Sequence, residues 1–251
     1  LIPFLVILGG GMLLLISFGI RHSFGLYLLP ITNFLDTGRE VFSFASALNV
    51  LMVGIGSPIF GALSDKYGSG KASLIGIIFV IISLIWMANI NNGLDLIITQ
   101  GIFGFGCAGC GTAVVLGAVG RSVKPESRTL YLGIVMAAGS FGQFIMVPLI
   151  SYMIQKLGWS QSILFLTYIA AIMIFFSFAL NFSQSSQSTK QGSNQTLVQA
   201  LNEAFISKSY ILLTLGFFVC GFHVTFVAVH LPAFLEDQKL PIWVGGWSLA
   251  F

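Results

Sequence analysis

Long apolar stretches separated by short polar segments dominate the chain. Each of the first seven stretches is long enough to cross about 30 Å of hydrocarbon as an α-helix. An eighth begins near the end of the sequence. The pattern therefore predicts an all-α membrane protein with seven full spans and the start of another. We place these spans at residues 3–33, 41–63, 72–90, 96–119, 129–155, 161–182, 209–235 and 241–251.

The composition supports a membrane location. Charged residues make up only 8% of the chain, hydrophobic residues make up 56%, and the mean hydropathy is +0.96. A soluble domain, in contrast, carries about a quarter charged residues. The net charge of +3 comes from bases spread over the predicted loops, where they form no patch. This distribution follows membrane topology and excludes nucleic acid as a partner.

The three cysteines, Cys107, Cys110 and Cys220, all lie inside apolar spans. Cys107 and Cys110 have the spacing of a redox pair, but they occur in a glycine-rich helix and not in the βαβ context that such a pair requires. We interpret them as packing residues and predict neither a metal site nor a cofactor. The spans also contain no Asp or Glu. Because a membrane enzyme needs converging carboxylates, a metal set or an activated nucleophile, we expect no catalytic activity.

Glycine-rich segments at 101–111 and 139–142 lie inside spans. Lipid gives helices no hydrophobic reason to associate, so small residues of this kind indicate close helix packing. Residues 183–195, in contrast, form a polar, low-complexity segment that cannot bury a core. It divides the chain into a six-helix amino-terminal bundle over 1–182, a linker over 183–208 and the start of a carboxy-terminal bundle over 209–251.

The distribution of bases predicts the orientation. If the first span runs outward, the inner loops carry seven Lys or Arg residues and the outer loops carry three. Positive residues favour the cytoplasmic side, so we expect a cytoplasmic amino terminus and linker in a cell (inner) membrane. The chain begins at Leu1 inside an apolar run, and we expect both ends to be truncated. The inner bases are Lys66, Lys71, Arg121, Lys124, Arg128, Lys190 and Lys208, and the outer ones are Arg39, Lys156 and Lys239.

Arg21 lies inside the first span, with Ser17 one turn away on the same face. A charge at such a position costs about 2.5–3.5 kcal/mol on insertion scales, so it normally faces a cavity or a partner. No acidic residue of the spans offers itself as that partner. A guanidinium can hold a carboxylate by two parallel hydrogen bonds, which favours an anionic substrate. The alternative is that Arg21 reaches the outer interface or pairs with Asp36 or Glu40.

Further polar residues lie inside the spans. His223 of the seventh span titrates near physiological pH, which makes it a candidate proton carrier; a neutral histidine bonded to a neighbouring helix is the alternative. Asn49, Gln100 and Gln143 could contact a substrate or could hold helices together. We therefore take Arg21, His223, Ser17, Asn49 and Gln143 as candidate substrate-binding residues.

A short charged segment, 61–71, connects the second and third spans. Gly61 would let two helices approach closely, Gly68 would allow a tight reversal, and Asp65 could cap a helix or pair with a base. This segment resembles the loop of the major facilitator superfamily with the pattern Gly-x-Leu-Ala-Asp-Arg-x-Gly-Arg-Lys. The matches are Gly61, Leu63, Asp65 and Gly68, with Lys66 as a base and Lys71 just beyond, whereas two basic positions read Ser69 and Gly70.

Other motifs narrow the resemblance to the oxalate/formate antiporter and monocarboxylate transporter branch of that superfamily. They are Gly19-Ile-Arg21-His-Ser23-Phe24-Gly25, Gly38-Arg39-Glu40-Val41-Phe42-Ser43, Pro148 and Gly158-Trp159-Ser160. The resemblance implies a twelve-span secondary transporter that moves small organic anions by alternating access, as a proton symporter or as an antiporter. Two alternatives stay open. One is transport of another solute, such as a sugar or drug, with Arg21 structural, and the other is a seven-span receptor or sensor.

The chain also contains an internal repeat. Residues 19–30 and 221–232 share a glycine, a basic or titratable residue, a hydroxyl, a phenylalanine and a terminal Leu-Pro at an offset of 202 residues. A parallel repeat would relate the first and seventh spans by an axis along the membrane normal. We therefore expect Arg21 and His223 to lie at equal depth and to face the space between the two bundles.

Overall fold

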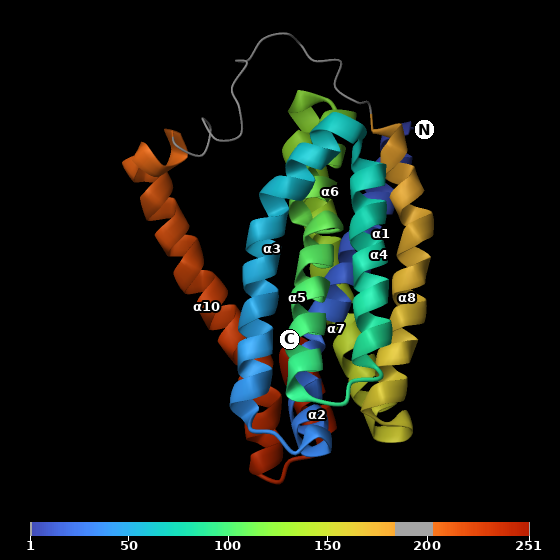
Figure 1. The fold of residues 1–251 in the computed structure, drawn as a ribbon. Helices are drawn as coiled ribbons and strands as arrows, with labels where there is room; N and C mark the ends of the chain where they lie inside the picture. Colours follow the sequence, from blue (N-terminus) through green and yellow to red (C-terminus); the bar gives the residue numbers. More distant parts are fainter. Residues whose placement is uncertain (1, 184–202, 251) are drawn as a thin grey trace.

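The computed structural model describes residues 2–183 and 203–250, and every regular element in these ranges is helical. Seven helical segments are long and apolar enough to span a membrane, which confirms the predicted all-α membrane fold (Figure 1). The α-helices are α1 (Ile2–His22), α2 (Leu28–Leu35), α3 (Arg39–Tyr67), α4 (Ser69–Met87), α5 (Gly93–Gly109), α6 (Thr112–Ser122), α7 (Arg128–Leu157), α8 (Trp159–Ala179), α10 (Lys208–Asp237) and α11 (Ile242–Ala250). Three short 3₁₀ helices are η1 (Phe24–Tyr27), η2 (Pro125–Ser127) and η3 (Leu180–Phe182).

The first and fourth predicted spans are each interrupted. In the first span, α1 ends at His22, and the tighter η1 precedes α2. The Ser23 hydroxyl donates a hydrogen bond to the Gly19 carbonyl oxygen at 2.6 Å, which satisfies a backbone acceptor at the interruption. In the fourth span, α5 and α6 are separated at Cys110 and Gly111. Hydropathy does not reveal either interruption, because both lie inside apolar runs.

The glycines of α5 allow it to pack between α3 and α4 (Figure 1). A methyl group added at Gly104 would collide with the backbone of Asn49 on α3. On the other side, a methyl group at Gly109 would lie 2.8 Å from the Gly76 Cα atom of α4. The backbones are therefore in direct contact, which confirms the interpretation of this segment as a packing face.

The second glycine-rich segment has the same role between α7 and α1. A methyl group at Gly142 would collide with the Leu15 backbone, and one at Gly139 would lie 2.9 Å from the Phe18 ring. Both small residues lie where α7 contacts α1. Glycines at three interfaces thus bring five helices of the amino-terminal bundle, α1, α3, α4, α5 and α7, into close contact.

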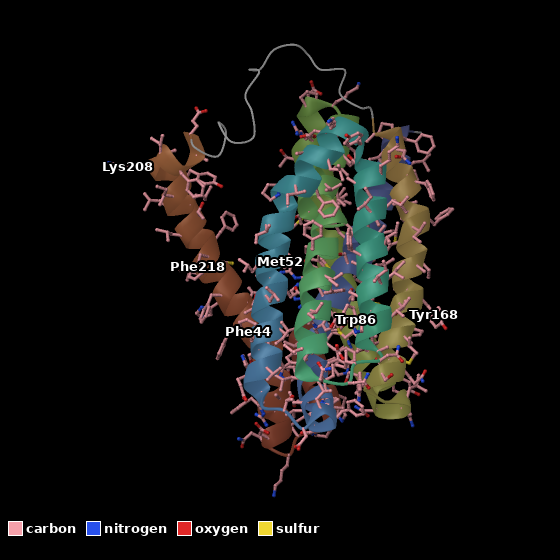
Figure 2. All side chains as sticks on the ribbon, in the orientation of Figure 1. Phe44, Met52, Trp86, Tyr168, Lys208 and Phe218 are labelled. Atoms are coloured by element: carbon pink, nitrogen blue, oxygen red, sulfur yellow. The ribbon has the colours of Figure 1, made fainter. Side chains whose placement is uncertain are left out.

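Helix α10 lies apart from this bundle over much of its length (Figure 1). It contacts η1, α2 and α11, and it diverges from α3 towards the end of the molecule at which Lys208 lies (Figure 2). Large apolar side chains on it and on α8 are exposed, including Phe218 and Tyr168, which are 69% and 72% exposed (Figure 2). Such surfaces suit lipid contact, because a soluble monomer rarely exposes extended apolar patches.

The domain boundaries expected from the sequence stay predictions. The first six spans pack together, α10 contacts α11, and α11 also packs against α7. Most of the predicted linker falls on 184–202, outside the described residues.

We predict that Gly104→Ala destabilises the protein, because the added methyl group would force α5 away from the Asn49 backbone. Overpacking of this kind costs about 1–3 kcal/mol. Thermal unfolding of the detergent-solubilised protein measures the effect. Gly54→Ala is the matched control on α3, since nothing lies within 4 Å of a methyl group there. Equal unfolding temperatures in the two variants would contradict the close contact.

Candidate functional site

A cavity of about 320 Å³ opens where α1, α3, α5 and α10 meet. The bundle contributes Arg21 at the end of α1, Asn49 of α3 and Gln100 of α5, while α10 contributes Cys220 and Thr225. Polar groups from both parts of the chain thus line one space inside an apolar molecule. A cavity with a few convergent polar groups is the leading candidate for a binding site.

The Arg21 guanidinium has no protein partner among the described residues. The ion pairs there are Arg39–Asp237 and Arg121–Asp65, so Arg21 pairs with neither Asp36 nor Glu40. It lines the interior cavity. An unpaired cation in such a place attracts an anion, because the low-dielectric surroundings strengthen the interaction.

Asn49 and Gln100 form a buried polar pair on the cavity wall, with exposed fractions of 6% and 2%. Asn49 Nδ2 donates to Gln100 Oε1 at 2.9 Å and to the Gln100 main-chain oxygen at 3.2 Å. The contact of Gly104 with the Asn49 backbone holds the two helices close enough for both bonds. The pair therefore combines the helix-bridging role with a place on the cavity wall.

The structure does not bring the other candidate residues to this cavity. The Ser17 hydroxyl lies 3.7 Å from Cys110 Sγ, in the interface of α1 with the glycine-rich segment. Gln143 Nε2 donates to the Leu249 main-chain oxygen at 2.7 Å and so connects α7 to α11. Each of these side chains holds helices together in the structure.

His223 is exposed and does not line the cavity. The lining residues Gly221 and Thr225 are each two positions from His223 on α10 and so lie about 160° from it around the helix axis, whereas Cys220, at the edge of the lining face, is about 60° away. The expectation that Arg21 and His223 face one shared space is therefore wrong for this structure. The repeat predicts the equivalence of the spans but does not fix the rotation of each helix about its axis.

The cavity residues that were not among the predicted binding residues include His22 and Gln100. His22 follows Arg21 and also lines the cavity, with its ring edge packed against Phe18 at 6.0 Å between centroids. Gln100 was recognised as an intramembrane polar residue, but its link to Asn49 depends on a contact between α3 and α5 that sequence spacing does not reveal. Its only signal was an amide within an apolar run.

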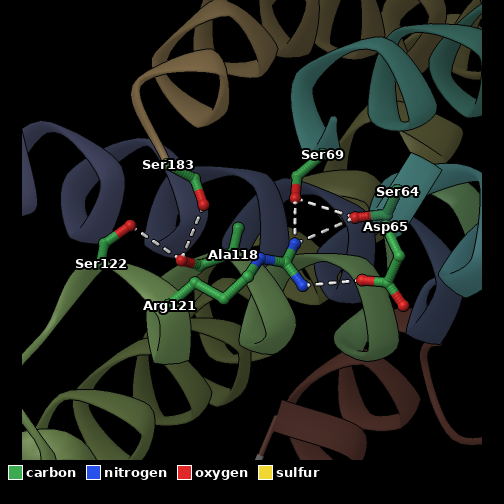
Figure 3. A network of polar contacts seen from close by, with 7 residues as sticks. All are labelled: Ser64, Asp65, Ser69, Ala118, Arg121, Ser122 and Ser183. Atoms are coloured by element: carbon green, nitrogen blue, oxygen red, sulfur yellow. Dashed lines mark hydrogen bonds and ion pairs between the residues drawn. The ribbon is translucent and has the colours of Figure 1, made fainter. Parts of the chain in front are cut away.

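The charged segment between α3 and α4 is built around Arg121 of α6 (Figure 3). Its guanidinium donates to Asp65 Oδ1 at 2.9 Å, to Ser64 Oγ at 3.2 Å and to Ser69 Oγ at 2.6 Å. The expectation that Asp65 pairs with a base agrees with this geometry. Arg121 thereby joins the end of α3 and the start of α4 to α6.

The chain reverses at a single residue, Gly68, whose φ of +98° lies in a region that favours glycine. The close approach expected at Gly61 is not made, since nothing lies within 4 Å of a methyl group placed there. Lys66 and Lys71 are both exposed. Lys66 Nζ lies over the Tyr67 ring, 5.1 Å from its centroid.

Ser69 occupies one of the two positions where the family pattern carries a base. In this chain its hydroxyl bonds with Ser64 Oγ at 2.8 Å and with Arg121. The charge that the loop lacks is thus supplied by α6, from 52 residues further along the chain. Sequence reasoning assigned Arg121 only to the inner-loop bases, because nothing local to 61–71 identifies it as the partner.

For the transporter that the sequence resemblance implies, we predict that Asp65→Asn lowers the maximal rate about threefold and leaves the half-saturating substrate concentration unchanged. The network lies at the end of the bundle, away from the cavity, so it affects movement more than binding. Arg121→Leu should have a larger effect, since it removes three hydrogen bonds. Transport kinetics at constant surface expression test this. An equal loss in the control Lys71→Gln would show that loop charge, and not the network, is responsible.

Comparisons with known proteins agree with the fold and the charged segment. A sequence profile described as Major Facilitator Superfamily matches residues 3–251. Monocarboxylate transporter 11 of Mus musculus is 24% identical over 155 residues, which cover 60% of this chain and 34% of that protein. The Homo sapiens protein of the same name is also 24% identical over 155 residues, covering 60% and 32%. The aligned part thus spans about a third of these relatives.

Two solved structures share the fold at low sequence identity. A bacterial homologue of the human lysosomal transporter Spinster, in an inward-facing and unoccupied conformation, superposes with a TM-score of 0.72 at 14% identity. The match covers 99% of this chain and 59% of that one. The nucleoside transporter NupG gives a TM-score of 0.72 at 13% identity, over 100% and 62% of the two chains.

The profile match shows the family, and the two solved structures share the fold. The sequence motifs that resemble this family lie on helices α1 to α8, and the segment with Asp65 is one of them. The chain belongs to the major facilitator superfamily.

Proposed function

We propose that the complete protein is a secondary active transporter of small organic anions, with a monocarboxylate as the preferred class. The observation that carries this proposal is the unpaired Arg21 guanidinium on the wall of a cavity between α1, α3, α5 and α10. A carboxylate can accept two parallel hydrogen bonds from such a group. The names of the curated relatives, which are monocarboxylate transporters, point to the same class.

The arrangement of α10 supports transport by alternating access. At one end, η1 meets α10 so closely that a methyl group at Gly25 would collide with the Ala228 backbone. At the other end α10 diverges from α3 (Figure 1). A cavity closed at one end and open at the other suits rocking of the two bundles around a central site. We propose that the open end is cytoplasmic, as the distribution of bases predicts.

Coupling to protons or to a counter-substrate forms the second part of the proposal. His223 stays a predicted proton carrier, but it lies away from the cavity that Arg21 lines. Transport of a sugar or drug, with Arg21 structural, is the competing function within the same family. The family assignment removes the seven-span receptor as an alternative.

We predict that Arg21→Lys lowers the uptake of labelled carboxylates about tenfold and that Arg21→Gln lowers it about a hundredfold. Lysine keeps the charge but loses the two-pronged geometry, whereas glutamine loses both, and a hydrogen bond to a charged group contributes about 1.5–3 kcal/mol. Uptake by the complete protein at equal surface expression, with and without a pH gradient, measures the effect. Unchanged carboxylate transport in Arg21→Gln would favour the sugar or drug alternative.

The closed end carries an ion pair between the two bundles. Arg39 at the start of α3 donates two hydrogen bonds to Asp237 at the end of α10, at 2.6 and 2.7 Å. Both side chains are about half exposed. Alternating access requires this end to open, so the pair must break in each cycle.

We predict that Asp237→Asn raises the labelling of Cys220 by a membrane-impermeant thiol reagent added outside the cell. Cys220 lines the cavity, and an exposed ion pair contributes about 1 kcal/mol or less, equivalent to at most about fivefold. The exchanged pair Arg39→Asp with Asp237→Arg should restore the original labelling. Glu236→Gln is the neighbouring control, and unchanged labelling in Asp237→Asn would show that the pair does not hold this end closed.

A further inference from the structure

The orientation of the two amides on the cavity wall is fixed by their surroundings. A main-chain carbonyl oxygen only accepts hydrogen bonds, so the Asn49 atom that faces the Gln100 carbonyl has to be the nitrogen, Nδ2. The same nitrogen donates to Gln100 Oε1. Gln100 Nε2 in turn faces Met87 Sδ, a weak acceptor, at 3.8 Å. The donor and the acceptor of each of these hydrogen bonds are therefore fixed.

Both protons of Asn49 Nδ2 are used in these hydrogen bonds to Gln100, and Asn49 Oδ1 remains as an acceptor. No described residue donates to Oδ1. The only fully buried side-chain nitrogen or oxygen without a partner in the described ranges is Thr37 Oγ1, so Asn49 Oδ1 must reach accessible space. Asn49 lines the cavity. The wall therefore presents an amide oxygen, which can only accept, in the same space as the Arg21 guanidinium, which can only donate.

We propose that Asn49, held by Gln100, selects carboxylates that carry a hydrogen-bond donor, such as a hydroxyl group, over those that do not. This inference rests on the proposed function, in which Arg21 holds the carboxylate. A hydroxyl group of the bound acid donates to Asn49 Oδ1. An acid without a donor leaves that oxygen desolvated and unpaired, and an acid with a carbonyl oxygen in the same place sets two acceptors against each other.

Gln100 acts in this scheme as a positioning residue. Its Oε1 and main-chain oxygen both accept from Asn49 Nδ2, which keeps the amide from turning its nitrogen towards the cavity. With the side-chain acceptor removed, one of the two bonds remains. The preference for a donor should then weaken without disappearing.

The test is competitive binding of four-carbon acids to the purified complete protein. Butanoate is compared with 2-hydroxybutanoate, 3-hydroxybutanoate and the two corresponding oxo acids, which differ from it only in one substituent. We expect at least one hydroxy acid to bind roughly three- to tenfold more tightly than butanoate, the gain typical of one hydrogen bond. We expect the matching oxo acid to bind more weakly than butanoate.

The following variants distinguish a loss of substrate selection from a loss of folding. Asn49→Leu should bring the ratio of hydroxy acid to butanoate affinity close to one while butanoate still binds. Gln100→Leu should lower the ratio in part. Thr99→Val is the control on α5, since this buried hydroxyl bonds only to the carbonyl oxygens of its own helix at Asp95 and Leu96. Its ratio should equal that of the original protein.

Equal binding of hydroxy acids and butanoate to the original protein would overturn the inference and leave carboxylate binding by Arg21 intact. A ratio that survives in Asn49→Leu would also overturn it, because another group would then receive the hydroxyl. If none of the acids competes, the proposed function itself fails and the inference fails with it. Because the first two outcomes are read from a ratio of affinities, a general loss of stability cannot produce them.

Discussion

The backbone contact between α3 and α5 at Gly104 is the constraint on which the rest of the molecule depends. In hydrocarbon, helices gain little from burying apolar surface against each other, so close packing and a few hydrogen bonds decide how they associate. Without a side chain at Gly104, the Asn49 backbone can lie directly against α5. Only at that separation can Asn49 reach both oxygens of Gln100. The same contact therefore determines the packing of the bundle and the chemistry of the cavity wall.

Much of the fold could be predicted because hydropathy reports directly on the solvent around each segment. The apolar runs at 41–63 and 129–155 predicted α3 and α7 to within a few residues. Both helices extend slightly further, into the charged residues that flank these runs. The interruptions at Ser23 and at Gly111 could not be predicted in this way. They are local changes of backbone geometry within apolar sequence, and they depend on tertiary contacts such as that of Gly25 with α10.

The candidate site was predicted in part, for a physical reason. Arg21 could be recognised because a charge in a span is costly wherever its partner lies, so its cost is visible in the sequence alone. Uncharged polar groups carry no such signal: Asn49 reaches the cavity, whereas Ser17 and Gln143 bond to other helices. Predicting whether His223 faces the cavity would require the rotation of α10 about its axis, which neither its residue type nor the internal repeat determines. The charged loop likewise revealed Asp65 but not its partner Arg121, because the two meet only in the folded bundle.

The two ion pairs lie at opposite ends of the molecule, and they differ in the way that the proposed rocking mechanism requires. Arg121 connects α3, α4 and α6 through a guanidinium whose side chain is 22% exposed, which holds these three elements together. Arg39 and Asp237 connect α3 to α10 and are 49% and 42% exposed. Asp65 is more open still, at 72%, but the Ser64 and Ser69 side chains that Arg121 also contacts are buried. Water can replace the partners of an exposed pair at little cost, whereas a more buried network loses more when it opens. In the proposed mechanism, the buried contacts around Arg121 would therefore persist, and the contact between α3 and α10 would break and re-form in each cycle.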